Sequence, residues 1–322
     1  MATGRRSFIK VAAMAAACLW GGPAALAEPP RAVRAVVSVP PLKGIVAAAL
    51  PKDATVESLI PPGASEHGYE IPPRKLAMLA TADVVVTVGL GVEPQVEKYL
   101  REHPRAGRVE VRFADVAGMA EAGHDHHEHE GHGEACEHSH SVDPHLWLDC
   151  EQVTKLAAAV HAKAAEGGLA GDRAALDAFN AKVAKVDESY RTMVAQAERR
   201  SMVVAHDAWG HLTRRYGLTF VAITGLQAGE ATPAAIESAV KASRELGVTA
   251  VAVEPQISQR VARRVAKAAN LRVLTLDPLG SGDWFELMER NLATLRDALG
   301  VRAQPATPVT PAEPAAESPS PT

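Results

Sequence analysis

Short apolar runs alternate along most of the chain with stretches in which apolar residues recur every three or four positions. The short runs are typical of buried strands, and the recurring spacing is typical of amphipathic helices. Strands are predicted at residues 33–39, 55–60, 83–88 and 109–113, and again at 202–205, 218–223, 248–253 and 273–276. Helices are predicted at residues 42–50, 74–80, 94–101, 207–216, 233–246, 258–269 and 283–299.

Strands that alternate with helices in this way predict parallel sheets covered by helices. The two series are separated by one long helical stretch, residues 172–200, which contains no Pro or Gly. We therefore predict an α/β fold of two parallel-sheet lobes with helices on both faces, joined by one long rigid helix. The expected boundaries are 28–170 for the N-terminal lobe, 171–200 for the linking helix and 201–301 for the C-terminal lobe.

Residues 1–27 have the pattern of a signal peptide rather than of a folded segment. Arg5 and Arg6 form a twin-arginine pattern, an uncharged Ala-rich stretch follows at 11–19, and Ala-Leu-Ala at 25–27 offers a cleavage site. Twin-arginine signals direct bacterial proteins across the membrane. An ordinary secretory signal with two chance arginines is the alternative, and both predict an exported, periplasmic protein.

Three further features concern anchoring and the far end of the chain. Lipid attachment at Cys18 is disfavoured, because Ala15 stands where such sites usually have Leu. No later apolar run is long enough to span a bilayer, so we expect no membrane span in the mature chain. Residues 302–322 are rich in Pro, Ala, Thr and Ser and have almost no large apolar side chain, which predicts a disordered tail.

Composition fits two ordinary globular domains. The chain has 322 residues, of which 47% are hydrophobic and 22% charged. A formal net charge of −4 argues against nucleic acid as a partner. Three cysteines exclude a disulfide-dense scaffold. Cys136 and Cys150 can still pair in an oxidising compartment, and this pairing stays open. We expect a monomer.

Histidine is unusually frequent, and much of it falls in one tract. The tract spans residues 121–141 and mixes imidazoles with carboxylates and glycines, so we expect it to be a disordered loop in the N-terminal lobe. Such a sequence binds divalent metals without a fixed fold. A passive polar insertion is the alternative. The proposed auxiliary, weaker metal ligands are His124, His126, His127, His129, His132, His138 and His140.

Four other residues lie at or just after strand ends, where open α/β sheets bind their ligands. They are His67, His145, His206 and Asp277. Two come from each half of the mature chain, so a cleft between the lobes would bring them together. Three imidazoles and one carboxylate suit tetrahedral Zn²⁺.

Each candidate also has a structural interpretation. Asp277 precedes Pro278 and would cap a turn, and His145 would be a buried structural histidine. His206 would begin a helix together with Asp207. Two nearby acids, Glu66 and Glu70, would be solvated loop residues. The spacing alone is not a short-range zinc motif, so the residues leave these alternatives open.

Several segments of the chain closely resemble the zinc-binding members of the cluster A-I solute-binding proteins, which serve ABC transporters for zinc and manganese. The matching segments are spread over residues 33–299 in family order and are specific only in combination. They are PPGASEHGYE, TADVVVTVGLGVE, the His-rich tract followed by DPHLWLD, VVAHDAWGHLTRRYGL, VAVEPQIS and LDPLGSGD. The resemblance implies two α/β lobes joined by a rigid helix, as the pattern does.

The resemblance also implies a ligand set. Carried over by motif, His67, His145 and His206 are metal ligands and Asp277 is the fourth. Glu66 and water compete with Asp277 for that fourth position. Histidine at the third position favours zinc, because manganese-binding relatives tend to have glutamate there. A manganese-binding member of the same family remains the alternative.

These observations predict a transport protein that captures Zn(II) outside the cytoplasm and delivers it to an ABC transporter membrane permease. No Walker A motif and no HExxH element is present, so neither ATP hydrolysis nor a zinc hydrolase is expected, and we predict that the chain is not an enzyme. A periplasmic zinc buffer or chaperone that works through the His-rich tract is the competing function. Asp143 and Asp207 are expected to orient ligand histidines, whereas His211 is expected at the surface.

Overall fold

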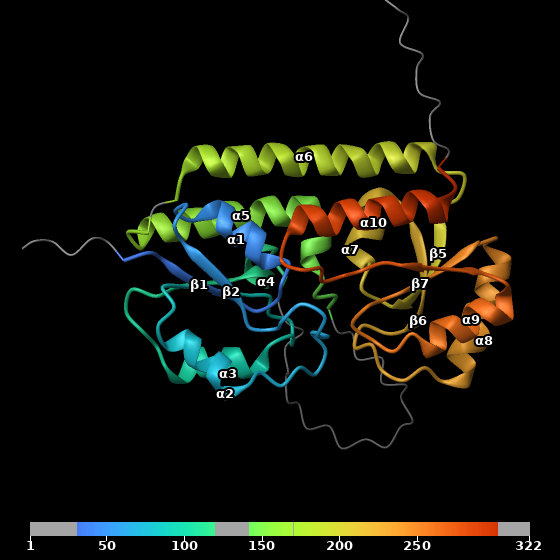
Figure 1. The fold of residues 1–322 in the computed structure, drawn as a ribbon, viewed down its shortest axis with the longest axis horizontal. Helices are drawn as coiled ribbons and strands as arrows, with labels where there is room; N and C mark the ends of the chain where they lie inside the picture. The colour runs from blue at the N-terminus through green and yellow to red at the C-terminus, as the bar shows by residue number, and fades with distance from the viewer. Residues whose placement is uncertain (1–30, 120–141, 170, 302–322) are drawn as a thin grey trace, which may run out of the picture. The chain divides into compact units, whose positions relative to one another are not determined.

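The computed structural model describes residues 31–119, 142–169 and 171–301 (Figure 1), and the secondary structure lies in a compact unit that begins at Ala32. The predicted signal peptide, His-rich tract and C-terminal tail lie outside the described residues. So does Cys136, and the pairing of Cys136 with Cys150 therefore stays open. Along the described parts of the chain, no helix is both long enough and apolar enough to cross a membrane.

Two four-stranded parallel sheets form the two lobes, as predicted. The N-terminal sheet has the order β2-β1-β3-β4, and the C-terminal sheet repeats it as β6-β5-β7-β8. The N-terminal strands are β1 (Arg34–Val37), β2 (Thr55–Ser58), β3 (Val84–Thr87) and β4 (Val109–Arg112). The C-terminal strands are β5 (Ser201–His206), β6 (Thr219–Thr224), β7 (Ala250–Val253) and β8 (Arg272–Thr275).

Helices lie on both faces of each sheet. In the N-terminal lobe they are α1 (Leu42–Ala49), α2 (Pro73–Leu76), η1 (Ala77–Ala80), α3 (Pro94–Glu102), α4 (Phe113–Val116), η2 (Leu146–Leu148) and α5 (Cys150–Glu166). In the C-terminal lobe they are α7 (Gly210–Tyr216), α8 (Pro233–Glu245), α9 (Arg260–Ala269) and α10 (Trp284–Leu299). The long helix between the lobes is α6 (Arg173–Gln196).

Alternate residues of the central strands enter different cores, because successive side chains of a strand point to opposite faces. In β1, Val37 joins a large apolar core, whereas Val36 faces a smaller core under α3. In β5, Val204 joins the same large core, whereas Val203 faces the core under α8 and α9. The large core therefore contains residues of both sheets, which ties the two lobes together on one side.

Helix α6 packs against α1 and α5 of the N-terminal lobe and against α10 of the C-terminal lobe (Figure 1). Asp172 caps its first turn, because the carboxylate accepts a hydrogen bond from the amide of Ala174. Phe179 and Tyr190 lie on its buried face and extend the large core. The linking helix of the prediction is thus a helix that shares a core with both lobes.

The sequence pattern missed helix α5, which follows His145 directly. Asp149 caps it through the amide of Glu151, and alanine lies on its buried side, as at Ala157, and on its exposed side, as at Ala158. Alanine gives a weak contrast between apolar and polar positions, so the helical periodicity of this segment is not distinct in the sequence. Helix α5 packs against α1 and α6 and thereby fixes the chain immediately after His145.

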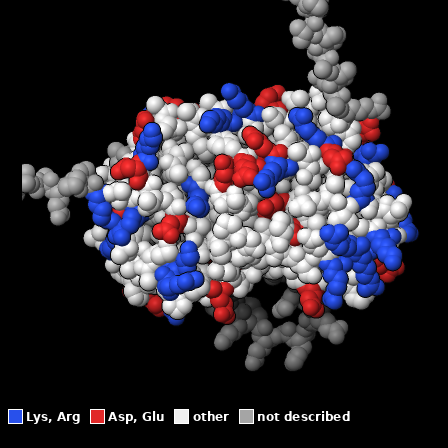
Figure 2. Space-filling view, in the orientation of Figure 1, with Lys and Arg blue, Asp and Glu red and all other residues white. Residues whose placement is uncertain are grey.

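Positive and negative side chains are mixed over most of the face in Figure 2, with a group of Lys and Arg over α8 and α9. Helix α9 explains part of that group, because Arg263, Arg264 and Lys267 are exposed while Val265 and Ala266 pack on the sheet. The helix is therefore amphipathic, and its outer face is basic.

Candidate metal centre

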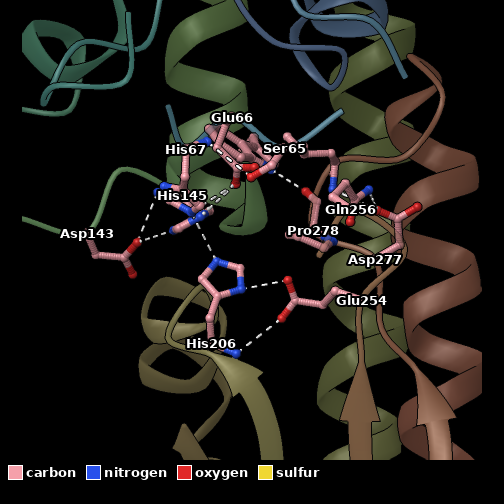
Figure 3. Close-up of polar contacts among 12 residues, drawn as sticks. Ser65, Glu66, His67, Asp143, His145, His206, Glu254, Gln256, Asp277 and Pro278 are labelled. Atoms are coloured by element: carbon pink, nitrogen blue, oxygen red, sulfur yellow. Dashed lines mark hydrogen bonds and ion pairs between the residues drawn. The ribbon is translucent and has the colours of Figure 1, made fainter. Parts of the chain in front are cut away.

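Three histidines and one glutamate from distant parts of the sequence meet at the strand ends. Each of Glu66, His67, His145 and His206 offers one ligand atom, and these four atoms all lie within 4.8 Å of one another. Glu66 and His67 come from the connection between β2 and α2, His145 immediately precedes η2, and His206 is the last residue of β5. Figure 3 shows the four side chains pointing toward a common centre.

The nitrogen atoms that converge are the Nε2 atoms of the three imidazoles. His67 Nε2 lies 3.3 Å from His206 Nε2, and His145 Nε2 lies 3.1 Å from Glu66 Oε1. Glu66 Oε1 is also 3.6 Å from His67 Nε2. One carboxylate oxygen and three imidazole nitrogens therefore surround a single point, which is the donor set that tetrahedral Zn²⁺ accepts.

The group is almost completely shielded from solvent. His145 and His206 are 0% and 1% exposed, and Glu66 is 2% exposed. The side chain of His67 is 10% exposed, so it is the most accessible of the four. A cation that entered here would lose nearly all of its hydration shell, and the four side chains would have to replace those water molecules.

His145 is held from behind by Asp143. Asp143 Oδ1 accepts a hydrogen bond from the backbone amide of His145 at 3.0 Å and lies 2.8 Å from His145 Nδ1. The main-chain oxygen of Asp143 in turn contacts His211 Nε2 at 2.9 Å. His211 is buried, so the expectation that it lies at the surface is wrong. The contact with His145 is the one through which Asp143 would orient a ligand histidine, and that role stays a prediction.

His206 is held by Glu254, which the sequence interpretation missed. Glu254 Oε2 lies 2.6 Å from His206 Nδ1, and Glu254 Oε1 accepts a 3.4 Å hydrogen bond from the backbone amide of His206. Asp207, which was expected in this role, is exposed. The sequence feature that could have indicated Glu254 is its position directly after β7, at the same edge of the sheet as His206.

The protonation states of two members of this group are set by burial and by their neighbours. Burial lowers the pKa of His67 to about 4, although the charge of Glu66 opposes this effect. Burial would raise the pKa of Glu66, but its hydrogen bond with His145 and the charge of the nearby imidazole hold that pKa below its ordinary value. Near neutral pH, His67 is therefore a neutral imidazole and Glu66 an ionised carboxylate.

His145 behaves in the opposite way, because it lies between two carboxylates. Burial lowers the pKa of His145, but its hydrogen bonds with Asp143 and Glu66 and their charges outweigh burial and raise the pKa to about 9. The pKa of Asp143 is lowered, because the contact with His145 outweighs burial. Without metal, His145 is thus an imidazolium at neutral pH, with one N–H directed at each carboxylate.

Asp277, the predicted fourth ligand, is not part of this group. Its Oδ1 accepts hydrogen bonds from the backbone amides of Leu279 and Gly280, both at 2.9 Å, and from the side chain of Gln256 at 2.7 Å. These contacts are those of a turn cap, which was the structural alternative for this residue. The carboxylate that the structure brings to the three histidines is Glu66, the competing candidate.

Buried tryptophans connect the two lobes beside the group. Trp147 Nε1 donates a hydrogen bond to the carbonyl oxygen of Pro278, and Trp284 Nε1 donates one to the carbonyl oxygen of Trp147. The ring of Trp147 also meets His145 edge to face, with centroids 5.4 Å apart. The segment that carries His145 is therefore bonded directly to the C-terminal lobe.

The family model described as "ZnuA: Zinc-uptake complex component A periplasmic" matches residues 35–298, most of the chain. The chain belongs to the ZnuA family. All four members of the central group lie inside the matched range, as do Asp143 and Glu254. The resemblance inferred from the sequence segments is therefore confirmed at the level of the family.

Individual relatives agree with the ZnuA assignment. The chain is 29% identical over 300 residues to the high-affinity zinc uptake system protein ZnuA of Yersinia pestis, covering 86% of this chain and 92% of that protein. It is 27% identical over 281 residues to the zinc-binding protein AdcA of Streptococcus pyogenes serotype M3, covering 79% of this chain. The matched region is 53% of AdcA, so it spans about half of that longer protein.

Solved structures confirm the fold. A crystal structure of a ZnuA deletion mutant with zinc bound superimposes with a TM-score of 0.68, at 24% sequence identity, and covers 85% of this chain and 100% of that one. The arrangement of two parallel-sheet lobes with surrounding helices is thus shared with ZnuA structures.

Proposed function

We propose that this chain is the extracytoplasmic binding protein of a zinc importer, which captures Zn(II) between its lobes and delivers it to an ABC permease. Membership of the ZnuA family supports this role, since the family is described as the periplasmic component of a zinc-uptake complex. The relatives named as zinc uptake and zinc-binding proteins point to the same cargo. The role is one of transport, and it requires no chemical turnover.

The observation that carries the proposal is the convergence of three imidazole Nε2 atoms and one carboxylate oxygen within 4.8 Å. We propose Glu66, His67, His145 and His206 as the zinc ligands. Imidazole nitrogen suits Zn²⁺, whereas Mn²⁺ prefers sites dominated by oxygen. The group is complete without a thiolate, because Cys150 is buried next to Tyr216 and contacts none of the four.

The arrangement favours tight binding because most of the ordering is complete before the metal arrives. His206 lies at the end of a central strand, and His145 is fixed by Asp143 and by the helix that follows. A site built on ordered elements loses little conformational entropy when it binds its ligand. Glu66 and His67 lie on an irregular connection rather than on a helix or strand. The Ser65 hydroxyl holds the backbone there, because it accepts a hydrogen bond from the His67 amide at 3.2 Å.

Metal competition on purified protein tests this function. The chain without residues 1–27, stripped of metal, should bind one Zn²⁺ tightly and prefer it to Mn²⁺. His67→Ala should weaken that site by orders of magnitude, and His103→Ala, which changes an exposed histidine, is the matched control and should leave it unchanged. A preference for Mn²⁺, or equal effects of the two substitutions, would contradict the assignment.

A further inference from the structure

The carboxylate of Glu254 is one of the most deeply buried charged groups in the protein. Glu254 is 1% exposed. In the part of the chain that the structure describes, no Lys or Arg forms an ion pair with it, and its ion-pair contact is with His206 Nδ1 at 2.6 Å. Burying a carboxylate is costly unless it is well paired. The contact with His206 therefore offsets part of the cost of burying the Glu254 carboxylate.

The placement of this pair follows from the sheet. Strands β5 and β7 are neighbours, and their register sets Val203 opposite Val251 and Val204 opposite Ala252. Continuing that register by two residues sets His206 opposite Glu254 at the carboxyl ends of the two strands. In the strand order β6-β5-β7-β8, the chain adds β6 on one side of β5 and β7 on the other, so the order reverses at β5. Open α/β sheets bind their ligands at such a switch point.

The contact decides which nitrogen of His206 is available to a metal. The 2.6 Å contact of Glu254 Oε2 with Nδ1 is an ion-pair contact rather than an aligned hydrogen bond. The negative charge beside Nδ1 favours the tautomer that carries its proton on that nitrogen. Nε2 is then left with a free lone pair, and Nε2 is the atom that lies 3.3 Å from His67 Nε2 in the central group. A carboxylate on the far nitrogen also makes a ligand imidazole more basic and fixes the orientation of its ring.

We propose that Glu254 is a positioning residue of the zinc site, which holds the His206 proton on Nδ1 and aims Nε2 at the metal. The inference rests on the proposed zinc function but concerns a residue outside the ligand set. In the N-terminal lobe, Asp143 Oδ1 lies 2.8 Å from His145 Nδ1 and is hydrogen-bonded to it. Each lobe thus supplies one ligand imidazole that is backed by its own carboxylate.

Glu254→Gln removes the charge and keeps the shape, so it is the test variant. Loss of a group that orients a metal ligand typically lowers metal affinity by about 10- to 100-fold, and we expect a weakening of Zn²⁺ binding in that range. The matched control is Glu93→Gln, because Glu93 is a buried glutamate of the other lobe that accepts from the backbone amides of Val88 and Gly89 and contacts none of the four ligands. The control should leave the affinity unchanged.

The tautomer of His206 gives a readout that a merely structural role would not move. Nitrogen-15 NMR of the zinc-free wild type should show the proton of His206 on Nδ1, and Glu254→Gln should show a mixture of tautomers. This measurement on the wild type also serves if the variant does not fold. If wild-type protein failed to bind Zn²⁺, the proposed function would fail, while the tautomer would still test the role of Glu254. An Nε2–H tautomer in the wild type, or equal zinc affinities of Glu254→Gln and wild type, would overturn the inference.

Discussion

Zinc binding should release about one proton at pH 8, and the proton should come from His145. The pKa of His145 is raised to about 9, because its contacts with Asp143 and Glu66 outweigh burial. The contact with Glu66 uses Nε2, the same nitrogen that would bind the metal. Zinc must therefore displace a proton that the empty site holds firmly, since only a neutral imidazole is a metal ligand.

The size of the effect follows from that pKa. A histidine with a pKa of about 9 is roughly 90% protonated at pH 8, whereas one with the ordinary value of about 6.5 is only about 3% protonated. The pKa of His67 is lowered to about 4, so His67 has no proton to lose. The zinc dissociation constant should consequently fall about tenfold per pH unit between roughly pH 7 and pH 8.5, and level off above about pH 9.

The same shift has a consequence for the stability of the zinc-free protein. The folded state holds the His145 proton more tightly than the unfolded state does, because the folded pKa is raised. This group therefore contributes stability that is fully present below the unfolded pKa of about 6.5 and is lost as the pH rises through about 9. Acid should thus weaken zinc binding while it leaves the contribution of His145 to stability intact.

Isothermal titration at pH 8 in two buffers with different enthalpies of ionisation measures the proton release directly. The observed binding enthalpy should change between buffers by about one buffer ionisation enthalpy. Asp143→Asn is the control, because it removes one of the two carboxylates that raise the pKa of His145 and should reduce the release. A binding enthalpy that does not depend on the buffer would show that His145 is neutral before zinc arrives and that its pKa is not raised.

Three further predictions concern the choice of ligands. Glu66→Gln should weaken Zn²⁺ binding by more than about 100-fold, because it removes a charged donor from a buried site, whereas Asp277→Asn should change the affinity only a few-fold. Competition with a chelator measures both affinities. A larger effect of Asp277→Asn than of Glu66→Gln would restore Asp277 as the ligand. Deleting residues 124–140 should leave one tight zinc per molecule and remove only weaker binding, as titration to saturation would show, and loss of the tight site would instead identify a tract-based buffer. Cys150→Ser should retain stoichiometric zinc, because the buried thiol contacts Tyr216 and no ligand; zinc content after gel filtration checks this.

Much of the fold is visible in the sequence because strands and helices of a parallel α/β protein carry strong, separate patterns. All eight predicted strands appear, and the runs that contain β1 and β5 differ from the structure only at their ends. Helix α5 was missed because alanine lies on both its buried and its exposed side, which weakens the contrast between the two. The shared core of the two lobes was also not apparent, since contacts such as Trp147 Nε1 with the Pro278 carbonyl join residues far apart in sequence.

The candidate site was only partly predictable. His67 and His206 can be found from the strand pattern, because they lie after β2 and at the end of β5. The expectation that His145 also lies at a strand end is wrong, since it precedes η2 and follows no strand directly in the described residues, but the three histidines do come together. The choice between two carboxylates cannot be made in this way, because Asp277 and Glu66 both follow strands and only the turn around Asp277 shows that its Oδ1 is already engaged. Glu254 was missed for a similar reason, since its partner is set by the register of two strands that are not adjacent in sequence.

We propose one buried group of three histidines and a glutamate as the zinc site of this protein. Chelator-competition titration of the chain without residues 1–27, carried out beside His206→Ala, tests it most directly. We expect one tight Zn²⁺ per molecule in the wild type and loss of that site in the variant, with any weak binding by the His-rich tract preserved. Tight stoichiometric zinc that survives His206→Ala would show that this group is not the zinc site, because the only proposed ligand from the C-terminal lobe would then be dispensable.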